Sequence, residues 1–283
     1  MQNMPHPSNL LLAERSQEGR RTPLMRSITR SAYFKLTLSL GIGLSALFCE
    51  VAHAQSTPTP VTLGVGIAAA PRYQGASDYH ITPFPLVYAS HSLFFVDGLS
   101  VGAAVPFGQY LKAGVLIAAV FGRDETDEAR LNGLGNIATS AALGGFLSWT
   151  SGPFDASAKY LQSAHTGYGA TLTLAAKYKL KLTARDQLSI GEDAVWSNAS
   201  ESQTYLGVTD IQARNSAAGL PAYAVGAGFH RVDTTLTLTH ALNRAWSVDG
   251  VLTASNLLGN AAKSPIVERS MSVFAGVGVA YTF

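Results

Sequence analysis

The stretch TLTLAAKYKLKL, Thr171 to Leu182, decides the fold class. Its hydrophobicity alternates with a period of two, which is typical of an extended strand with two different faces. One face carries Leu172, Leu174, Ala176, Tyr178, Leu180 and Leu182, and the other carries Thr171, Thr173, Ala175, Lys177, Lys179 and Lys181. In a membrane-spanning barrel the second face cannot contact lipid, because one lysine at the bilayer midplane costs about 2–4 kcal/mol. We therefore expect Lys177, Lys179 and Lys181 to face water or to line a polar lumen.

The same alternation recurs along the chain, and helical periodicity is nearly absent. It predicts twelve strands, near residues 61–70, 82–90, 92–96, 99–105, 110–122, 137–149, 154–163, 170–181, 187–198, 224–240, 245–256 and 270–283. After residue 54, no stretch has the roughly 18 consecutive apolar residues that a membrane-spanning helix needs. If the chain crosses a membrane, it crosses with strands.

The connections between these strands alternate in length. Short ones lie at residues 91, 106–109, 150–153, 183–186 and 242–245, and long ones at 71–81, 122–136, 164–169, 199–223 and 257–269. Only the connection at 97–98 breaks the rule. Bacterial outer-membrane barrels have short periplasmic turns and longer outer loops. We therefore predict an all-β, antiparallel, up-and-down transmembrane barrel of twelve strands, or of ten if 92–96 and 99–105 fuse.

The last strand is expected to close the barrel. In VFAGVGVAYTF, Val273 to Phe283, one face is uniformly apolar and the other is mostly small. Closure matters because lipid offers no partner for unpaired backbone groups. Tyr281 and Phe283 are predicted to join the aromatic girdle at the periplasmic interface. A terminal strand that ends in Phe is a feature of outer-membrane barrels, and we expect the barrel assembly machinery to bind it.

The N-terminal region predicts export. Six basic residues between Arg15 and Lys35 precede a 14-residue apolar run, Leu36 to Cys49, and the small-residue pattern Ala52-His53-Ala54. The run is too short for a spanning helix, so residues 1–54 are predicted to be a cleaved signal peptide, and an uncleaved anchor is the alternative. Met25 is a second candidate start. Residues 55–60 would form a periplasmic tail and 61–283 the barrel.

Charge excludes one class of partner. The chain as printed carries a net charge of +2, but without residues 1–54 it has 14 basic and 15 acidic residues. The basic excess thus belongs to the export signal, and we expect no nucleic-acid binding.

Six segments, in order along the chain, resemble the MipA/OmpV family of outer-membrane proteins. They are PRYQGASDYHITPFPLV (71–87), LFFVDGL (93–99), FGRDETDEARLNGLGNI (121–137), YLGVTDIQARNSAAGLPAY (205–223), NAAKSPIVERS (260–270) and FAGVGVAYTF (274–283). The resemblance implies a monomeric or weakly associating barrel among outer-membrane lipid and lipopolysaccharide. For the founding member it implies a scaffold that holds a murein lytic transglycosylase to a peptidoglycan synthase.

Two functions follow as hypotheses. The resemblance favours a non-enzymatic envelope scaffold, and the polar lumen favours a small-solute diffusion channel.

One residue departs from the alternation of apolar and polar positions, because Glu192 falls in the lipid-facing phase with Leu188 and Ile190. A bulge between Ile190 and Asp193 would restore the alternation.

Candidate catalytic and metal motifs are weak. GLSVG, Gly98 to Gly102, matches the pattern G-x-S-x-G, but that motif needs a following helix and none is predicted. His240 and His230 have no serine or acidic partner at a recognisable spacing. The acidic run 124–128 lacks the ligand spacing of a calcium loop and is expected to be a solvated outer loop. We expect no catalytic residue, cofactor or metal.

Processing can be tested directly. Ala52 and Ala54 supply the small side chains that signal peptidase accepts, so the mature protein should begin at Gln55. Mass spectrometry of the protein from outer membranes should find this N-terminus. Retention of residues 36–50 would contradict both the cleavage site and the topology.

Overall fold

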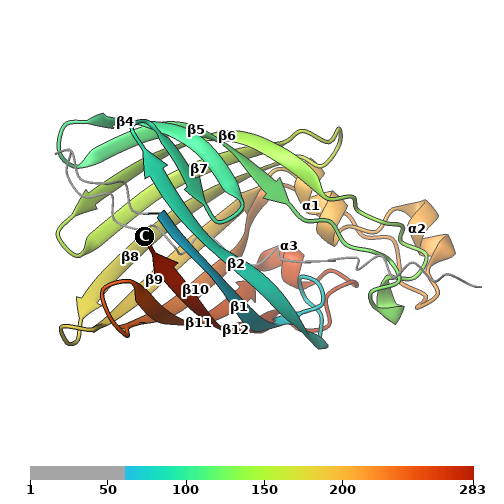
Figure 1. Cartoon of the computed structure of the whole chain (residues 1–283). Coiled ribbons are helices and arrows are strands. Elements are labelled where there is room, and N and C mark those ends of the chain that lie inside the picture. Colours follow the sequence, from blue (N-terminus) through green and yellow to red (C-terminus); the bar gives the residue numbers. More distant parts are fainter. Residues whose placement is uncertain (1–60) are drawn as a thin grey trace, which may run out of the picture. The chain divides into compact units, whose positions relative to one another are not determined.

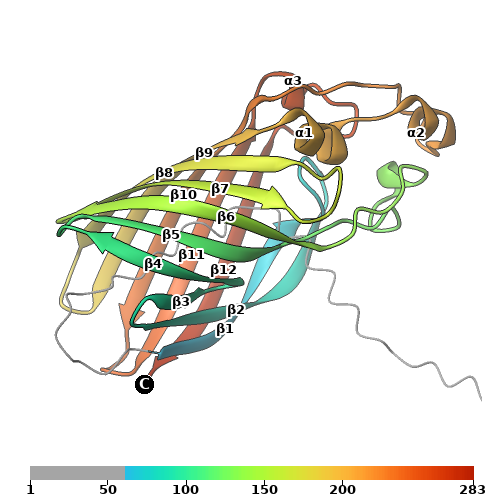
Figure 2. The same ribbon diagram turned by 90° about the horizontal axis from the view of Figure 1, so that it is seen from above.

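The structure, a computed structural model, describes residues 61–283, which form a closed barrel of twelve antiparallel strands (Figures 1 and 2). Each strand pairs with its neighbours in sequence, and β1 pairs with β12 to close the ring. The strands are β1 Val61–Pro71, β2 Tyr79–His91, β3 Phe94–Asp97, β4 Ser100–Phe107, β5 Leu111–Val120, β6 Ser140–Ser151, β7 Phe154–Ser163, β8 Ala170–Lys181, β9 Asp186–Ser197, β10 Gly228–Ala241, β11 Trp246–Leu257 and β12 Met271–Thr282. The prediction of a twelve-stranded up-and-down barrel is confirmed.

The ten-strand alternative is wrong. Gly98 has φ 55°, a left-handed conformation that glycine adopts without strain, and it turns the chain between β3 and β4. The two strands pair from Phe94 with Ala103 to Asp97 with Ser100, so they form a hairpin and do not fuse.

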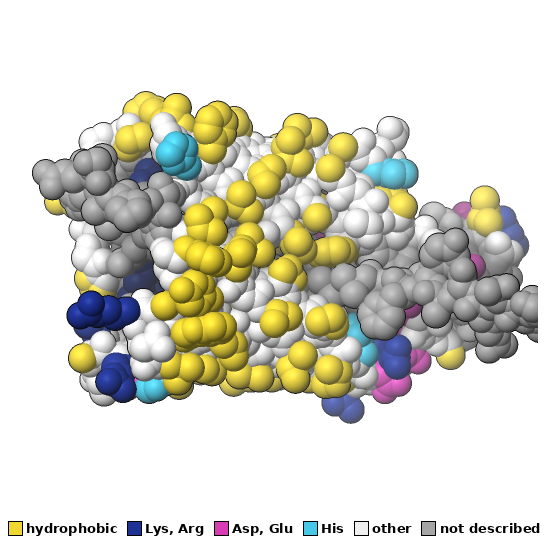
Figure 3. All heavy atoms as spheres, in the orientation of Figure 1, with side chains coloured by type: hydrophobic (Ala, Val, Ile, Leu, Met, Phe, Trp, Pro, Cys, Tyr) yellow, Lys and Arg dark blue, Asp and Glu magenta, His cyan; other side chains and the backbone are white. Residues whose placement is uncertain are grey.

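Two ends of the barrel differ. The turn end carries the C-terminus and all the short connections except the β3–β4 turn, and the loop end carries the long ones (Figure 1). The outer wall between them is apolar: Val65, Ile67, Val115, Leu143 and Val277 are among its exposed side chains. Figure 3 shows hydrophobic side chains gathered in a band across this wall. Alternation along each strand places the opposite residues inside.

Aromatic residues ring the turn end. Trp246 and Tyr281 have ring centroids 5.0 Å apart, and Tyr281 and Phe283 4.8 Å apart. Phe154 and Tyr178 form a similar contact at 4.7 Å. Such girdles lie at membrane interfaces in barrels.

The expected bulge in β9 is wrong. The register of β9 with both neighbours is continuous through Ile190 and Asp193, and Glu192 lies exposed on the outer wall. The Thr234 hydroxyl of β10 donates a 2.7 Å hydrogen bond to Glu192, so the carboxylate has a partner without a shift of register. The register shift lies instead in β10, between Phe229 and Arg231.

The long connections fold into a cap at the loop end. It contains η2 Ala129–Leu131, α1 Ala199–Leu206, α2 Asp210–Asn215 and α3 Gly259–Ala262. Asn198 caps α1, and Thr209 and Gln212 form a capping box on α2. The cap has its own hydrophobic cluster, formed by Tyr73, Ala76, Leu131, Leu134, Val208, Leu220 and Ile266. Within residues 61–283, no helix is long and apolar enough to cross a membrane.

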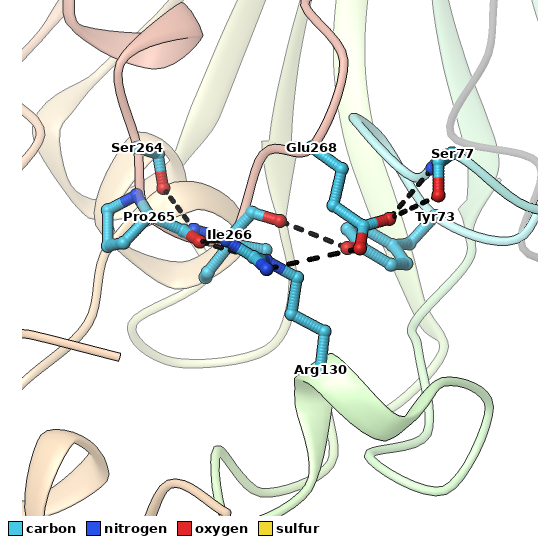
Figure 4. Close-up of polar contacts among 7 residues, drawn as sticks. All are labelled: Tyr73, Ser77, Arg130, Ser264, Pro265, Ile266 and Glu268. Atoms are coloured by element: carbon cyan, nitrogen blue, oxygen red, sulfur yellow. Dashed lines mark hydrogen bonds and ion pairs between the residues drawn. The ribbon is translucent and has the colours of Figure 1, made fainter. Parts of the chain in front are cut away.

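Polar contacts tie the connections of the cap together (Figure 4). Arg130 donates to the Pro265 carbonyl through Nε at 3.0 Å and Nη2 at 2.6 Å. Glu268 accepts from both the backbone N–H and the hydroxyl of Ser77, at 2.9 and 2.8 Å. The Tyr73 hydroxyl donates to the Ile266 carbonyl at 3.0 Å. Three connections that are distant in sequence are thereby held as one unit.

The topology can be tested with epitope tags. Tags after Glu128, near Ala217 and after Lys263 should be reached by antibody on intact cells, because these positions lie in the long connections. Tags at Gly152 and Asn243, in short turns, should be reached only after permeabilisation. Surface labelling at either turn would invert the barrel.

The cap should loosen in acid. The hydrogen bond from the Ser77 backbone N–H, helped by the Ser77 hydroxyl and Arg130, holds the pKa of Glu268 below its ordinary value. A depressed carboxyl pKa stabilises the folded cap above the unfolded value of about 4.3, and this contribution is lost as the pH falls through the folded pKa. Amide exchange of residues 72–78, corrected for intrinsic rates, should therefore accelerate between about pH 5 and pH 3.

The Glu268→Gln variant should show less of this pH dependence, whereas Asp210→Asn, at the exposed start of α2, should behave like the wild type. The same pH dependence in Glu268→Gln would show that another group controls the cap.

Candidate functional site

The inside of the barrel has an apolar side and a polar side. The apolar side lies on β1, β2 and β12, where Ala68, Ala70, Phe84, Leu86, Phe274 and Ala280 form one buried cluster. The polar side lies on β8 to β11, where the buried residues include Thr173, Asp193, Asp233, Thr235, Thr237, Thr253 and Ser255. The interior is thus divided between strands that contribute apolar side chains and strands that contribute polar ones.

Two of the three predicted lumen lysines lie in this interior. Lys179 Nζ is 3.0 Å from Asp155 Oδ2, and the Lys179 side chain is only 9% exposed. Lys177 lies directly across from Asp155 in the β7–β8 ladder, and the two charges interact. Lys181, the last residue of β8, is exposed at the turn end. Lys177 and Lys179 are thus paired with acidic groups inside the barrel.

A charge interaction also crosses the barrel. Asp97 ends β3, yet its charge interacts with Lys159 of β7 and Lys177 of β8, which are not neighbours of β3 in the sheet. Near the same level Thr253 is 2% exposed and Asp233 1%. Charged and buried polar side chains therefore occupy part of the interior at mid-height.

Toward the loop end, the interior contains a cavity of about 170 Å³ that α1 helps to line. Phe121, Leu161 and Val195 contribute apolar surface, and Glu201, Tyr205, His230 and Arg231 contribute polar groups. The Tyr205 hydroxyl donates to the Phe121 carbonyl at 3.3 Å, which ties α1 to the end of β5.

The charged groups of this region are strongly desolvated. Burial raises the pKa of the Glu201 carboxyl, and the Ser197 hydroxyl and the charges of Arg231 and His230 offset part of that rise. Burial also lowers the pKa of Arg123 to about 10. Arg123 Nη1 donates to the Tyr205 carbonyl at 2.9 Å, but its Nε has no partner among residues 61–283. A buried cation with an unsatisfied donor is suited to an anionic ligand.

His240 differs from the expectation, because it does have an acidic partner. His240 Nδ1 is 2.6 Å from Asp186 Oδ1, and the two residues lie directly across the β9–β10 ladder. Thr183 Oγ1 donates to the other Asp186 oxygen. Sequence spacing could not reveal a pair 54 positions apart, which only the strand register brings together. His230 lies elsewhere, with Nε2 2.8 Å from the Gly226 carbonyl.

The remaining motifs have structural roles. Ser100 of the GLSVG stretch begins β4, and a strand follows it. In the acidic run, Glu125 accepts hydrogen bonds from the backbone N–H groups of Gly133 and Gly135, both at 2.9 Å. This carboxylate therefore stabilises the connection between β5 and β6, in which it lies. In the described part of the chain, no group of three or more His, Cys, Asp and Glu side chains is arranged to hold a metal ion.

Solved structures with a similar arrangement are outer-membrane proteins. An outer-membrane channel from Pseudomonas putida F1 aligns over 83% of this chain and 100% of its own, at 10% identity and a TM-score of 0.42. The CymD monoaromatic hydrocarbon channel aligns over 79% and 87%, at 12% identity and 0.38. OmpT of Vibrio cholerae aligns over 80% and 97%, at 8% identity and 0.35. No curated protein sequence matches the chain.

The family model described as "MltA-interacting protein MipA" matches residues 63–283, which is the barrel from its first strand to its last residue. The closed ring of twelve strands and its apolar outer band fit a protein of the outer membrane. This chain belongs to the MipA family of outer-membrane proteins.

Proposed function

We propose that the protein is a non-enzymatic scaffold of the outer membrane that binds a peptidoglycan-remodelling enzyme at its turn end. The family description names an interaction with MltA, and the resemblance noted from the sequence adds a murein lytic transglycosylase and a peptidoglycan synthase as the partner classes. The apolar band would contact lipid, and the loop end would face lipopolysaccharide.

The charge pairs inside the barrel carry the preference for a scaffold over a channel. Lys179 is paired with Asp155, and the charge of Asp97 reaches Lys177 and Lys159 across the barrel. Free diffusion of a solute would require these groups to separate in a desolvated environment, where unpaired charges are costly. A barrel with this interior is better suited to be a rigid scaffold than to conduct ions or solutes.

The turn end offers a basic surface. Lys181, Arg185 and Arg244 are exposed there, and Figure 3 shows Lys and Arg side chains at this end of the displayed face. The nearby Asp186 is engaged by His240 and Thr183. Because stable interfaces bury about 800 Å² on each partner, the enzyme would have to cover several turns at once. We expect its contact surface to be acidic and its binding to be transient.

The diffusion channel is the second candidate, and the polar side of the interior favours it. If the charge pairs open, Lys177 and Lys179 would line the path. A Lys177→Glu, Lys179→Glu variant would then reverse the ion selectivity of the barrel, whereas a scaffold would show no steady conductance in either form.

Binding to a purified murein lytic transglycosylase tests the scaffold. The Arg185→Glu, Arg244→Glu variant should weaken binding about tenfold or more, because it reverses two charges at the proposed interface. Arg214→Glu, the same change in α2 at the loop end, should bind like the wild type. Interferometry on protein in lipid nanodiscs would measure all three affinities.

Equal affinities for the three proteins would place the interface elsewhere. No binding at all, together with solute flux in liposomes that depends on Lys177 and Lys179, would overturn the scaffold and favour the channel.

A further inference from the structure

The barrel wall is incomplete over its loop half. β2 has 13 residues, but β3 has only four and pairs with β2 no further than Tyr88. The β3–β4 turn therefore lies partway along β2, where Gly98 N donates to the Val87 carbonyl at 2.8 Å and the Leu99 carbonyl accepts from Ala119 N at 3.2 Å. Figure 2 shows β3 ending well short of β2. Beyond this turn, residues 79–86 of β2 have no strand partner on that side among residues 61–283.

The sequence of β2 is adapted to this free edge. Backbone groups of alternate residues point to opposite neighbours, and the bond from Gly98 to the Val87 carbonyl shows that the odd-numbered residues point away from β1. Pro83 and Pro85 are therefore on the free edge, where they remove two N–H donors. An unsatisfied N–H in lipid is costly, and these prolines avoid that cost at two positions.

The prolines also argue against strand addition at this edge. A strand from another chain would gain its affinity from ladder hydrogen bonds with alternate N–H and C=O groups. At Pro83 and Pro85 the donors are missing, so such a ladder would be broken at two consecutive positions on this side. The break in the wall is therefore suited to remain open to lipid.

Apolar side chains line the inner side of the break. Phe121, just after β5, packs against the cluster that contains Phe84 and Leu86 of β2. Phe121 and Val120 also line the cavity, so one side of the break and the cavity share these residues. Arg123, with its unsatisfied and buried Nε, follows two positions later and contacts Tyr205 of the cavity lining.

We propose that the break between β2 and the end of β5 is a lateral entrance through which an amphipathic molecule with an anionic head passes from the membrane into the cavity. Its chain would slide between Phe84 and Phe121, and its head would reach the region of Arg123. This path needs no opening of the charge network at mid-height and no displacement of the cap.

Photo-crosslinking in liposomes tests the entrance. The full-length mature protein is reconstituted in phosphatidylcholine with dodecanoic acid that carries a diazirine on its chain, and crosslinked positions are mapped by mass spectrometry. We expect crosslinks at cavity residues such as Leu161 and Tyr205. Phe121→Ala should raise their yield several-fold, and Phe121→Trp should lower it. Phe146→Ala, the same truncation inside the barrel next to Phe95, should leave the yield unchanged, because Phe146 lines neither the cavity nor the apolar cluster of β2.

Two further probes separate the alternatives. A diazirine-bearing dodecyltrimethylammonium should give several-fold fewer cavity crosslinks, because its cationic head is repelled by Arg123. A water-soluble diazirine-bearing butyrate reports entry from the loop end. Cavity labelling by butyrate alone would overturn the lateral route, as would crosslinks of the dodecanoic acid confined to outward side chains such as Ile81 and Leu174 in every variant.

The free edge itself can be tested by restoring its donors. The Pro83→Ala, Pro85→Ala variant should lower the thermal midpoint of the barrel in lipid, because two N–H groups would face the membrane unpaired. Pro106→Ala, near the turn end of β4, should have little effect because water can satisfy its N–H. A raised midpoint in the first variant would mean that another strand pairs with this edge, and would overturn the proposal.

Discussion

The structure depends on one constraint, which is that lipid cannot satisfy a backbone N–H or C=O group. A sheet in this environment must close on itself, and the pairing of β1 with β12 from Thr62 and Thr282 to Ala69 and Ala275 achieves that closure. Small residues in β12 make it possible, because Gly276 and Gly278 leave interior space for Phe84 and Leu86. On the stretch of β2 that has no second strand partner among residues 61–283, Pro83 and Pro85 remove two of the donors that would face lipid.

Closure also determines the interior. The side chains inside the twelve strands are apolar beside β1, β2 and β12 and charged beside β7 to β10. The cap adds a second layer, because its hydrophobic cluster and the contacts of Arg130 and Glu268 hold three connections over the loop end. A loop end covered by packed connections and an interior with paired charges fit a scaffold, and an apolar side next to the wall break fits lateral entry.

The sequence was sufficient for the fold because a two-residue period, turn chemistry and connection length are local signals. The alternation predicts twelve strands, and all twelve lie near the expected positions. The site was harder to predict because its contacts join distant strands. Thr234 satisfies Glu192 from 42 positions away, Asp97 reaches Lys177 only after the ring closes, and Arg123 becomes buried only when the cap folds. Pro83 and Pro85 of β2 can be read from the sequence, but only the strand pairing shows that they lie on the free edge and remove its N–H donors.

Magnetic resonance in lipid bilayers can test whether the wall is incomplete beside β2, since it reports the partner of each backbone amide. The Ile81 amide, on the free edge of β2, should show contacts to lipid acyl protons and no cross-strand contact, whereas the His80 amide should show contacts to Ala70 of β1. A contact between the Ile81 amide and a strand on its free side would mean that the wall is complete and that no lateral entrance exists there.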